Sequence, residues 1–124
     1  AGHSLDGKRR GTHQIYRALC RELGLPARVS LADLLPPPPL RRLELGPGLA
    51  AEEALRLCLR AVHDVRRDHD SLLRESRRQG MAKGFDACRA HYPLRREFAT
   101  LEVALDEPNA ALASLLAGAG FRLA

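Results

Sequence analysis

The stretch that decides the fold runs from residue 50 to residue 79 and reads AAEEALRLCLRAVHDVRRDHDSLLRESRRQ. Apolar or small side chains recur through it in steps of four and three residues, which is the heptad pattern of helices that pack side by side. The pattern predicts one long helix over residues 50–79, ended by the glycine that follows it. Its heptad seam consists of Ala51, Leu55, Cys58, Val62, Val65, His69, Leu72 and Ser76.

Three shorter helices are expected on either side of this long one. Apolar residues recur at helical spacing over residues 12–23 and again over residues 93–106, and Pro108 suits the first turn of a last helix over residues 108–117. The fold class predicted from these patterns is all-α, a small helical bundle around one long central helix. The apolar positions are Ile15, Leu19 and Leu23 in the first helix, and Leu94, Phe98, Leu101 and Leu105 in the second.

The composition agrees with a helical fold. Hydrophobic residues make up 45% of the 124 residues, but aromatic residues make up only 4% and tryptophan is absent. A core built mainly from Leu, Ala and Val suits helices packed on helices better than a sheet, which favours β-branched and aromatic residues.

Two segments are expected to differ from the helices in character. Residues 1–11 are polar and glycine-rich and are interpreted as a flexible basic arm, followed by a single helical domain over residues 12–124. Residues 25–48 form a connector rich in proline and glycine, and four consecutive prolines at positions 36–39 favour a polyproline II conformation.

Arginine dominates the positive charge of the chain, whose formal net charge is +5. The planar guanidinium forks of arginine suit phosphate or carboxylate partners, so nucleic acid is a possible partner. In the long helix the arginines are interleaved with acidic residues, which also allows surface ion pairs. The residues that would contact RNA or DNA under this alternative are Arg66, Arg67, Arg77 and Arg78.

The motifs that usually mark an enzyme are absent from the sequence. It holds no phosphate-binding loop, no dinucleotide-binding glycine pattern and no nucleophile elbow. Two His-Asp pairs begin at His63 and His69, but a spacing of six residues puts the two imidazoles about 120° apart around a helix. We therefore expect no catalytic residue, no metal site and no cofactor, and interpret the chain as a protein that is not an enzyme.

The cysteines and the hydropathy bear on the compartment. Three cysteines lie far apart at positions 20, 58 and 88, which argues against a disulfide framework and favours a reducing, intracellular compartment. No run of eighteen apolar residues occurs, so we expect no membrane span.

The segment from Ile15 to Leu23 reads IYRALCREL and resembles the opening helix of the mitochondrial LYR-motif family. That family also has a phenylalanine after basic residues, which the segment from Arg95 to Phe98 resembles. The resemblance implies a small mitochondrial accessory or assembly factor in the matrix, with an acyl carrier protein among its partners. The segment RQGM at residues 78–81 is in addition similar to the succinate dehydrogenase assembly factors.

The hypothesis drawn from the sequence is a non-enzymatic helical interaction module, an adaptor or assembly factor within a larger complex. The alternative is a basic, ribosome-associated domain that binds RNA or DNA. Under the first hypothesis a protein partner contacts the heptad seam, the first helix and the segment around Phe98. The candidate partner-binding residues are Tyr16, Arg17, Leu55, Val62, Val65, Leu72, Arg95, Arg96 and Phe98.

Overall fold

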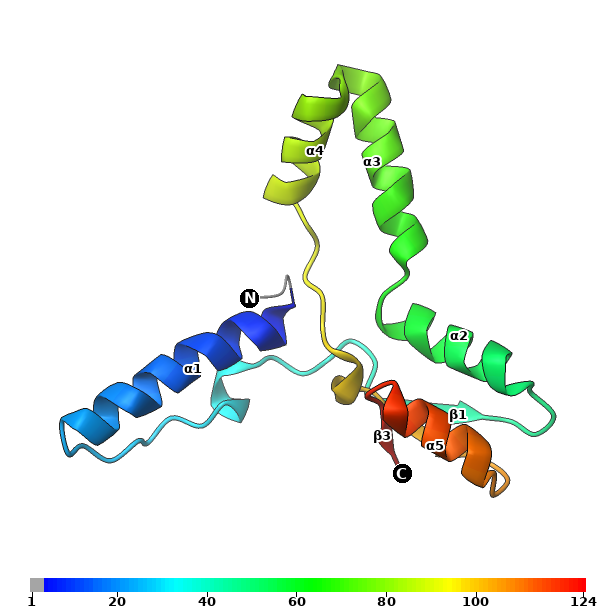
Figure 1. The fold of residues 1–124 in the computed structure, drawn as a ribbon, viewed down its shortest axis with the longest axis horizontal. Helices are drawn as coiled ribbons and strands as arrows, with labels where there is room; N and C mark the ends of the chain where they lie inside the picture. The colour runs from blue at the N-terminus through cyan, green and yellow to red at the C-terminus, as the bar shows by residue number, and fades with distance from the viewer. Residues whose placement is uncertain (1–3) are drawn as a thin grey trace.

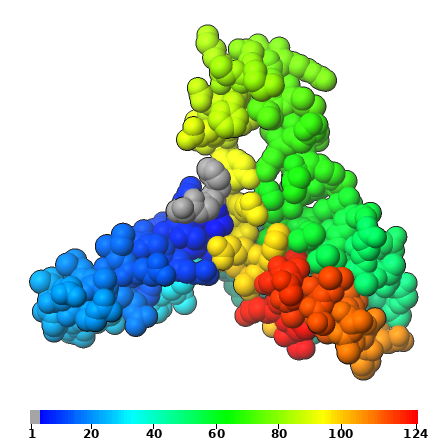
Figure 2. Space-filling view, in the orientation of Figure 1, coloured from blue at the N-terminus to red at the C-terminus, as the bar shows by residue number. Residues whose placement is uncertain are grey.

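In the computed structural model, which describes residues 4–124, the chain forms a small α/β core from which two helical arms extend (Figure 1). One arm contains the helix α1 (Leu5–Glu22), and the other is a hairpin of α3 (Val65–Gln79) and α4 (Met81–Ala90). The space-filling view shows the same three lobes, separated by open space (Figure 2). None of the helices among the described residues has the length and apolar character needed to cross a membrane.

The core contains a parallel sheet of three strands in the order β1–β2–β3. The strands are β1 (Arg42–Leu45), β2 (Glu102–Leu105) and β3 (Arg122–Leu123), and Leu43 lies opposite Val103 in the central pair. Two helices, α2 (Ala51–Val62) and α5 (Ala110–Gly118), supply the remaining helical part of the core. The buried apolar cluster draws on β1, β2, α2, α5 and the residues just before β2 and β3. It consists of Leu45, Ala54, Cys58, Leu101, Val103, Leu112, Leu116 and Phe121.

The all-α prediction is wrong, because the segment assigned to a helix over residues 93–106 contains β2. Leu101 and Leu105 are four residues apart, a spacing that fits a helix face and, with Val103 between them, also fits alternate positions of a strand. Leu101 and Val103 are both almost completely buried. The residues before the strand are extended except for one 3₁₀ turn, η2 (Phe98–Thr100).

The predicted long helix over residues 50–79 is also wrong, because it is two helices, α2 and α3, that meet at a sharp break. His63 is extended, with φ −154°, and the Asp64 carboxylate accepts a hydrogen bond from the backbone N–H of Arg66. Asp64 is therefore the N-cap of α3. The heptad pattern of apolar residues continues across this cap, so that pattern alone did not indicate the break.

The hairpin arm depends on two glycines. Gly80 has a φ of 86° and joins α3 to α4 in a conformation that other residues rarely adopt. Gly84 is buried where α4 crosses α3, and a Cβ atom placed there would lie 2.7 Å from the backbone nitrogen of Ser76. The two helices therefore approach closely at this point, although α3 itself contains no buried residue.

The arm that contains α1 begins earlier than the predicted helix over residues 12–23. Ser4 caps α1 by accepting a hydrogen bond from Gly7, so residues 5–11 of the expected flexible arm form its first turns. Residues 1–3 of that segment lie outside the described part. After α1 the chain returns beside it, and the hydroxyl of Tyr16 accepts hydrogen bonds from the backbone N–H groups of Arg28 and Val29.

The remaining predicted elements are the last helix and the proline-rich connector. The last predicted helix, over residues 108–117, corresponds to α5, which starts two residues later and is capped by Asn109. The proline-rich connector contains one short 3₁₀ turn, η1 (Ala32–Leu34), and the strand β1. The division of the chain into a basic arm and one domain stays a prediction.

Candidate functional site

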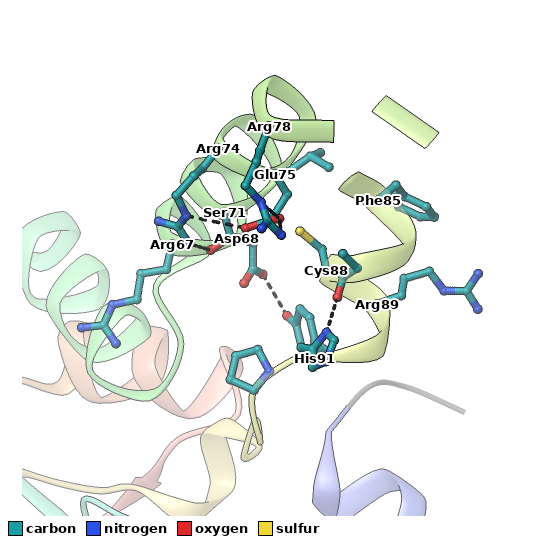
Figure 3. Close-up of a pocket in the computed structure, with 14 residues that line it drawn as sticks. Arg67, Asp68, Ser71, Arg74, Glu75, Arg78, Phe85, Cys88, Arg89 and His91 are labelled. Carbon is teal, nitrogen blue, oxygen red and sulfur yellow. Dashed lines mark hydrogen bonds and ion pairs between the residues drawn. The ribbon is translucent and has the colours of Figure 1, made fainter. Parts of the chain in front are cut away.

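A groove with a volume of about 640 Å³ lies between α3 and α4 (Figure 3). We call it the hairpin groove. The two helices are in close contact at Gly84 and lie farther apart toward the core (Figure 1). Its lining residues are Arg67, Asp68, Ser71, Leu72, Arg74, Glu75, Arg78, Phe85, Ala87, Cys88, Arg89, His91, Tyr92 and Pro93.

Three side chains form a hydrogen-bonded cluster at the core end of the hairpin groove. The carboxylate of Asp68 lies 2.9 Å from Nε2 of His63 and accepts a hydrogen bond of 2.8 Å from the hydroxyl of Tyr92. Burial and the neighbouring Asp68 carboxylate together raise the pKa of Tyr92, so its hydroxyl stays protonated. The cluster ties the C-terminal end of α4 to the break between α2 and α3.

Glu75 occupies the other end of the hairpin groove. Its carboxylate accepts hydrogen bonds from the guanidinium of Arg78 at 2.8 Å and from the side-chain amide of Gln79 at 3.0 Å. The hydrogen bond from Arg78 lowers the pKa of Glu75, which keeps the carboxylate ionised. Both carboxylates of the groove are thus already engaged by neighbouring side chains.

The chemistry that this arrangement can perform is limited. Within residues 4–124 no group of three or more His, Cys, Asp or Glu side chains could hold a metal ion. The thiol of Cys88 points into the groove (Figure 3), but His91, the imidazole beside the groove, bonds the carbonyl of Ala87. The groove therefore has the character of a binding surface, apolar along its walls and charged at its ends.

The structure distributes the predicted partner-binding residues over all three lobes. Tyr16 and Arg17 lie on α1, while Val65 begins α3 and is 66% exposed. Leu72 lines the hairpin groove. The remaining ones lie at the core, where Leu55, Val62 and Phe98 are partly buried against the apolar cluster and Arg95 and Arg96 precede η2.

Arg96 is not a surface contact. Its guanidinium is buried in a bidentate ion pair with Asp6, 90 residues earlier in the chain. No local pattern links the two positions, so the sequence offered no signal that could have identified this pair. The role of Arg96 and of the other predicted residues in binding a partner stays a prediction.

Two of the four arginines predicted to contact nucleic acid form ion pairs with acidic neighbours. Arg66 forms an ion pair with Asp64, and Arg78 forms one with Glu75. Arg67 lines the hairpin groove, and Arg77 borders a shallower hollow on the same helix. Their role in binding nucleic acid stays a prediction.

The described chain is thus a small parallel α/β domain with two helical arms, and the hairpin groove lies on one of those arms. It belongs to the DUF3410 family, described as a domain of unknown function, whose model matches residues 34–120. The matched region contains β1, β2 and the hairpin, and it leaves α1 and β3 outside.

Curated relatives carry the name erythronate-4-phosphate dehydrogenase. The one from Chromohalobacter salexigens is 54% identical over 123 residues, covering 99% of this chain and 32% of the relative. Those from Pseudomonas syringae pv. tomato and Marinobacter nauticus are 45% and 40% identical, covering 97% and 99% of this chain and 32% and 33% of the relatives. The chain therefore spans about a third of the length of the curated relatives it matches.

These similarities correct four expectations from the sequence. The resemblance to the mitochondrial LYR-motif family is wrong, because the chain matches a different family over most of its length. The non-enzymatic assembly module and the absence of any enzyme are wrong, because the relatives are dehydrogenases. The mitochondrial placement is wrong as well, because these relatives come from bacteria.

A dehydrogenase passes hydride to a cofactor such as a nicotinamide or a flavin. Dinucleotide sites use a glycine-rich turn between a strand and the N-terminus of a helix. Two turns join a strand to a helix here: GPGLA (residues 46–50) leads from β1 to α2, and DEPN (residues 106–109) leads from β2 to α5. In the second turn the side chain of Asn109 accepts a hydrogen bond from the backbone N–H of Leu112. The glycine turn after β1 does not open a short βαβ unit of the kind that binds dinucleotides, because α3 and α4 separate α2 from β2, so residues 4–124 do not fit such a site.

Proposed function

We propose that the chain is a domain of an erythronate-4-phosphate dehydrogenase and that, within this enzyme, it packs against the other parts of the molecule. Relatives of this name cover almost the whole chain at up to 54% identity, which supports the first part of the proposal. The lack of a fitting cofactor site in the described residues supports the second part. Hydride transfer would then take place elsewhere in the enzyme.

The observation that carries the packing role is an apolar stripe on α1. Ile15, Leu19 and Leu23 are 72%, 56% and 61% exposed, and their spacing of four residues places them on one side of the helix. Covering an exposed aliphatic side chain completely is worth roughly 1.5–3 kcal/mol. Such a stripe at the surface of a soluble protein marks an interaction site.

The hairpin arm supports the same conclusion. Its longer helix, α3, contains no buried residue, and Phe85 and Met81 of α4 are half exposed or more. Isolated helices of 10 to 15 residues are marginal in water, because helical stability comes mainly from packing of an amphipathic face. Both arms therefore carry apolar faces that another part of the enzyme would cover.

The test uses the full-length dehydrogenase and follows oxidation of erythronate 4-phosphate with NAD or NADP as hydride acceptor. We expect turnover by the wild-type enzyme and at least a tenfold loss with Leu19→Glu, because a carboxylate would enter an apolar contact. The matched control is Gln14→Glu, which adds the same charge to α1 about 140° away from Leu19 around the helix. The control should keep nearly full activity.

Two results would contradict the proposal, and they are distinguishable. Absence of turnover by the wild-type enzyme would refute the assignment to this dehydrogenase. Equal activities of Leu19→Glu and Gln14→Glu would instead refute the packing role of the stripe and leave the enzyme assignment intact.

A further inference from the structure

The arm formed by residues 4–36 is joined to the rest of the described chain through polar contacts. In the hydrogen bonds that the structure assigns between residues 4–36 and residues 37–124, the second partner always lies in residues 95–97. None of the described arm residues belongs to the buried apolar cluster of the core. The buried apolar cluster therefore does not set the direction in which α1 leaves the core.

Arg96 is the centre of this junction. Its Nε donates to Oδ2 of Asp6 at 2.9 Å and its Nη2 donates to Oδ1 at 3.1 Å, while the two side chains are only 10% and 6% exposed. The remaining nitrogen, Nη1, donates to the carbonyl oxygen of Pro36 at 2.6 Å. One guanidinium thus holds both the first turn of α1 and the end of the segment that returns beside it.

The backbone next to Arg96 completes the contact. The N–H of Glu97 donates to Oδ2 of Asp6 at 3.0 Å, and the N–H of Leu5 donates to the carbonyl of Arg95 at 2.8 Å. The hydroxyl of Ser4 donates to the Glu97 carboxylate at 3.0 Å. Three segments of the chain therefore meet in one hydrogen-bonded polar cluster. This cluster fixes the rotation of α1 as well as its position.

We propose that Asp6 and Arg96 form a positioning clasp that holds the arm in a single direction and so presents the apolar stripe of α1 to the surface it packs against. The planar fork of arginine imposes two parallel hydrogen bonds on the carboxylate, which a point charge such as lysine does not. Because the pair is buried, neither side chain can exchange its partner for water without a large loss. The use of the stripe rests on the proposed function, whereas the clasp itself does not.

A second link between the same two segments provides a matched comparison. Arg10 of α1 lies 3.3 Å from the other carboxylate oxygen of Glu97, but its side chain is 52% exposed. Exposed pairs of this kind contribute little, because water competes for both partners. We therefore expect that the buried Arg96 fixes the direction of the arm and that the exposed Arg10 does not.

The experiment measures the direction of the arm in the full chain by pulsed electron spin resonance. Spin labels are attached through unnatural amino acids at Gln14 on α1 and at Glu53 on α2, so that the native cysteines stay in place. We expect a narrow distance distribution in the wild type, at least a doubling of its width in Arg96→Gln and Asp6→Asn, and no rescue in Arg96→Lys. Arg10→Gln should keep the narrow distribution, and hydrogen exchange in the sheet, α2 and α5 should stay unchanged in all four variants.

Three outcomes would overturn the clasp. A broad distribution in the wild type would show that the arm has no single direction, and a narrow one in both Arg96→Gln and Asp6→Asn would show that other contacts fix it. Loss of exchange protection throughout the sheet in these variants would make the pair a support of the whole fold. An unaffected clasp together with a fully active Leu19→Glu enzyme would refute only the packing role of the stripe.

Discussion

The absence of a side chain at Gly84 determines how closely α4 approaches α3. A Cβ atom at this position would lie 2.7 Å from the nitrogen of Ser76 and 2.8 Å from the carbonyl carbon of Glu75, and both are backbone atoms that cannot move independently of α3. The close crossing of the hairpin, and with it the shape of the hairpin groove, therefore requires glycine at this position.

Gly84→Ala should consequently push α4 away from α3 and destabilise the chain by about 1–3 kcal/mol, the usual range for overpacking. Denaturant unfolding and hydrogen exchange of α3 and α4 measure the effect. Gly11→Ala is the control, because Gly11 lies within α1 with nothing within 4 Å of the added Cβ. It should stabilise the chain by about 0.5–1 kcal/mol, and equal effects of both substitutions would contradict the steric argument.

Asp6 gives the arm a dependence on pH. Burial alone would raise the pKa of this carboxyl, but the hydrogen bonds from Arg96 and from the N–H of Glu97 outweigh it and hold the pKa below its ordinary value of 3.8. A carboxyl whose pKa is lower in the folded state contributes stability at neutral pH, and this contribution is lost as the pH falls below about 4 and through the folded pKa.

Asp6→Asn should remove this part of the acid sensitivity. We expect its free energy of unfolding to depend less steeply on pH between about 5 and 2 than that of the wild type, because one proton fewer is taken up on unfolding. Denaturant titrations at several pH values measure the two slopes. Identical slopes would mean that Asp6 does not gain its partner on folding.

At the scale of elements, the break between α2 and α3 depends on the cap at Asp64. Its carboxylate accepts the N–H of Arg66, one of the backbone donors that a helix start leaves without a partner. Asp64→Ala should cost about 0.5–2 kcal/mol, measured by denaturant unfolding together with the exchange rate of the Arg66 amide. Asp70→Ala removes the same charge from an exposed position within α3 and should leave both measurements nearly unchanged.

The elements also show what could be predicted from the sequence. The apolar spacing of Ile15, Leu19 and Leu23 correctly indicated a helix, but its start was placed too late because the cap at Ser4 lies within a glycine-rich stretch. The sheet was missed because its pairs are non-local: Arg42 lies opposite Glu102 in the ladder, and short apolar runs fit helix and strand alike. Leu72 was a predicted contact and does line the groove, whereas Asp6 and Arg96 lie too far apart in sequence for any pattern to join them.

At the scale of the whole molecule, a small core supports two long arms (Figure 2). Leu116 is completely buried in that core between α5 and the sheet. Leu116→Ala should therefore cost about 2–5 kcal/mol and lower the stability of the sheet, since the cavity cannot be refilled from the exposed arms. Leu94→Ala removes the same atoms from a side chain that is 81% exposed and should change the unfolding free energy by less than about 0.5 kcal/mol.

The hairpin leaves the core and returns to it at nearly the same place, since Nε2 of His63 lies 3.5 Å from the hydroxyl of Tyr92. Without α3 and α4, the path from β1 through α2 to β2 is an ordinary βαβ unit, complete in its parallel pairing. The hairpin is therefore an insertion in the crossover connection between β1 and β2. A change in the length of the hairpin would therefore leave the register between β1 and β2 unaltered, because both of its ends lie at the same place on the core.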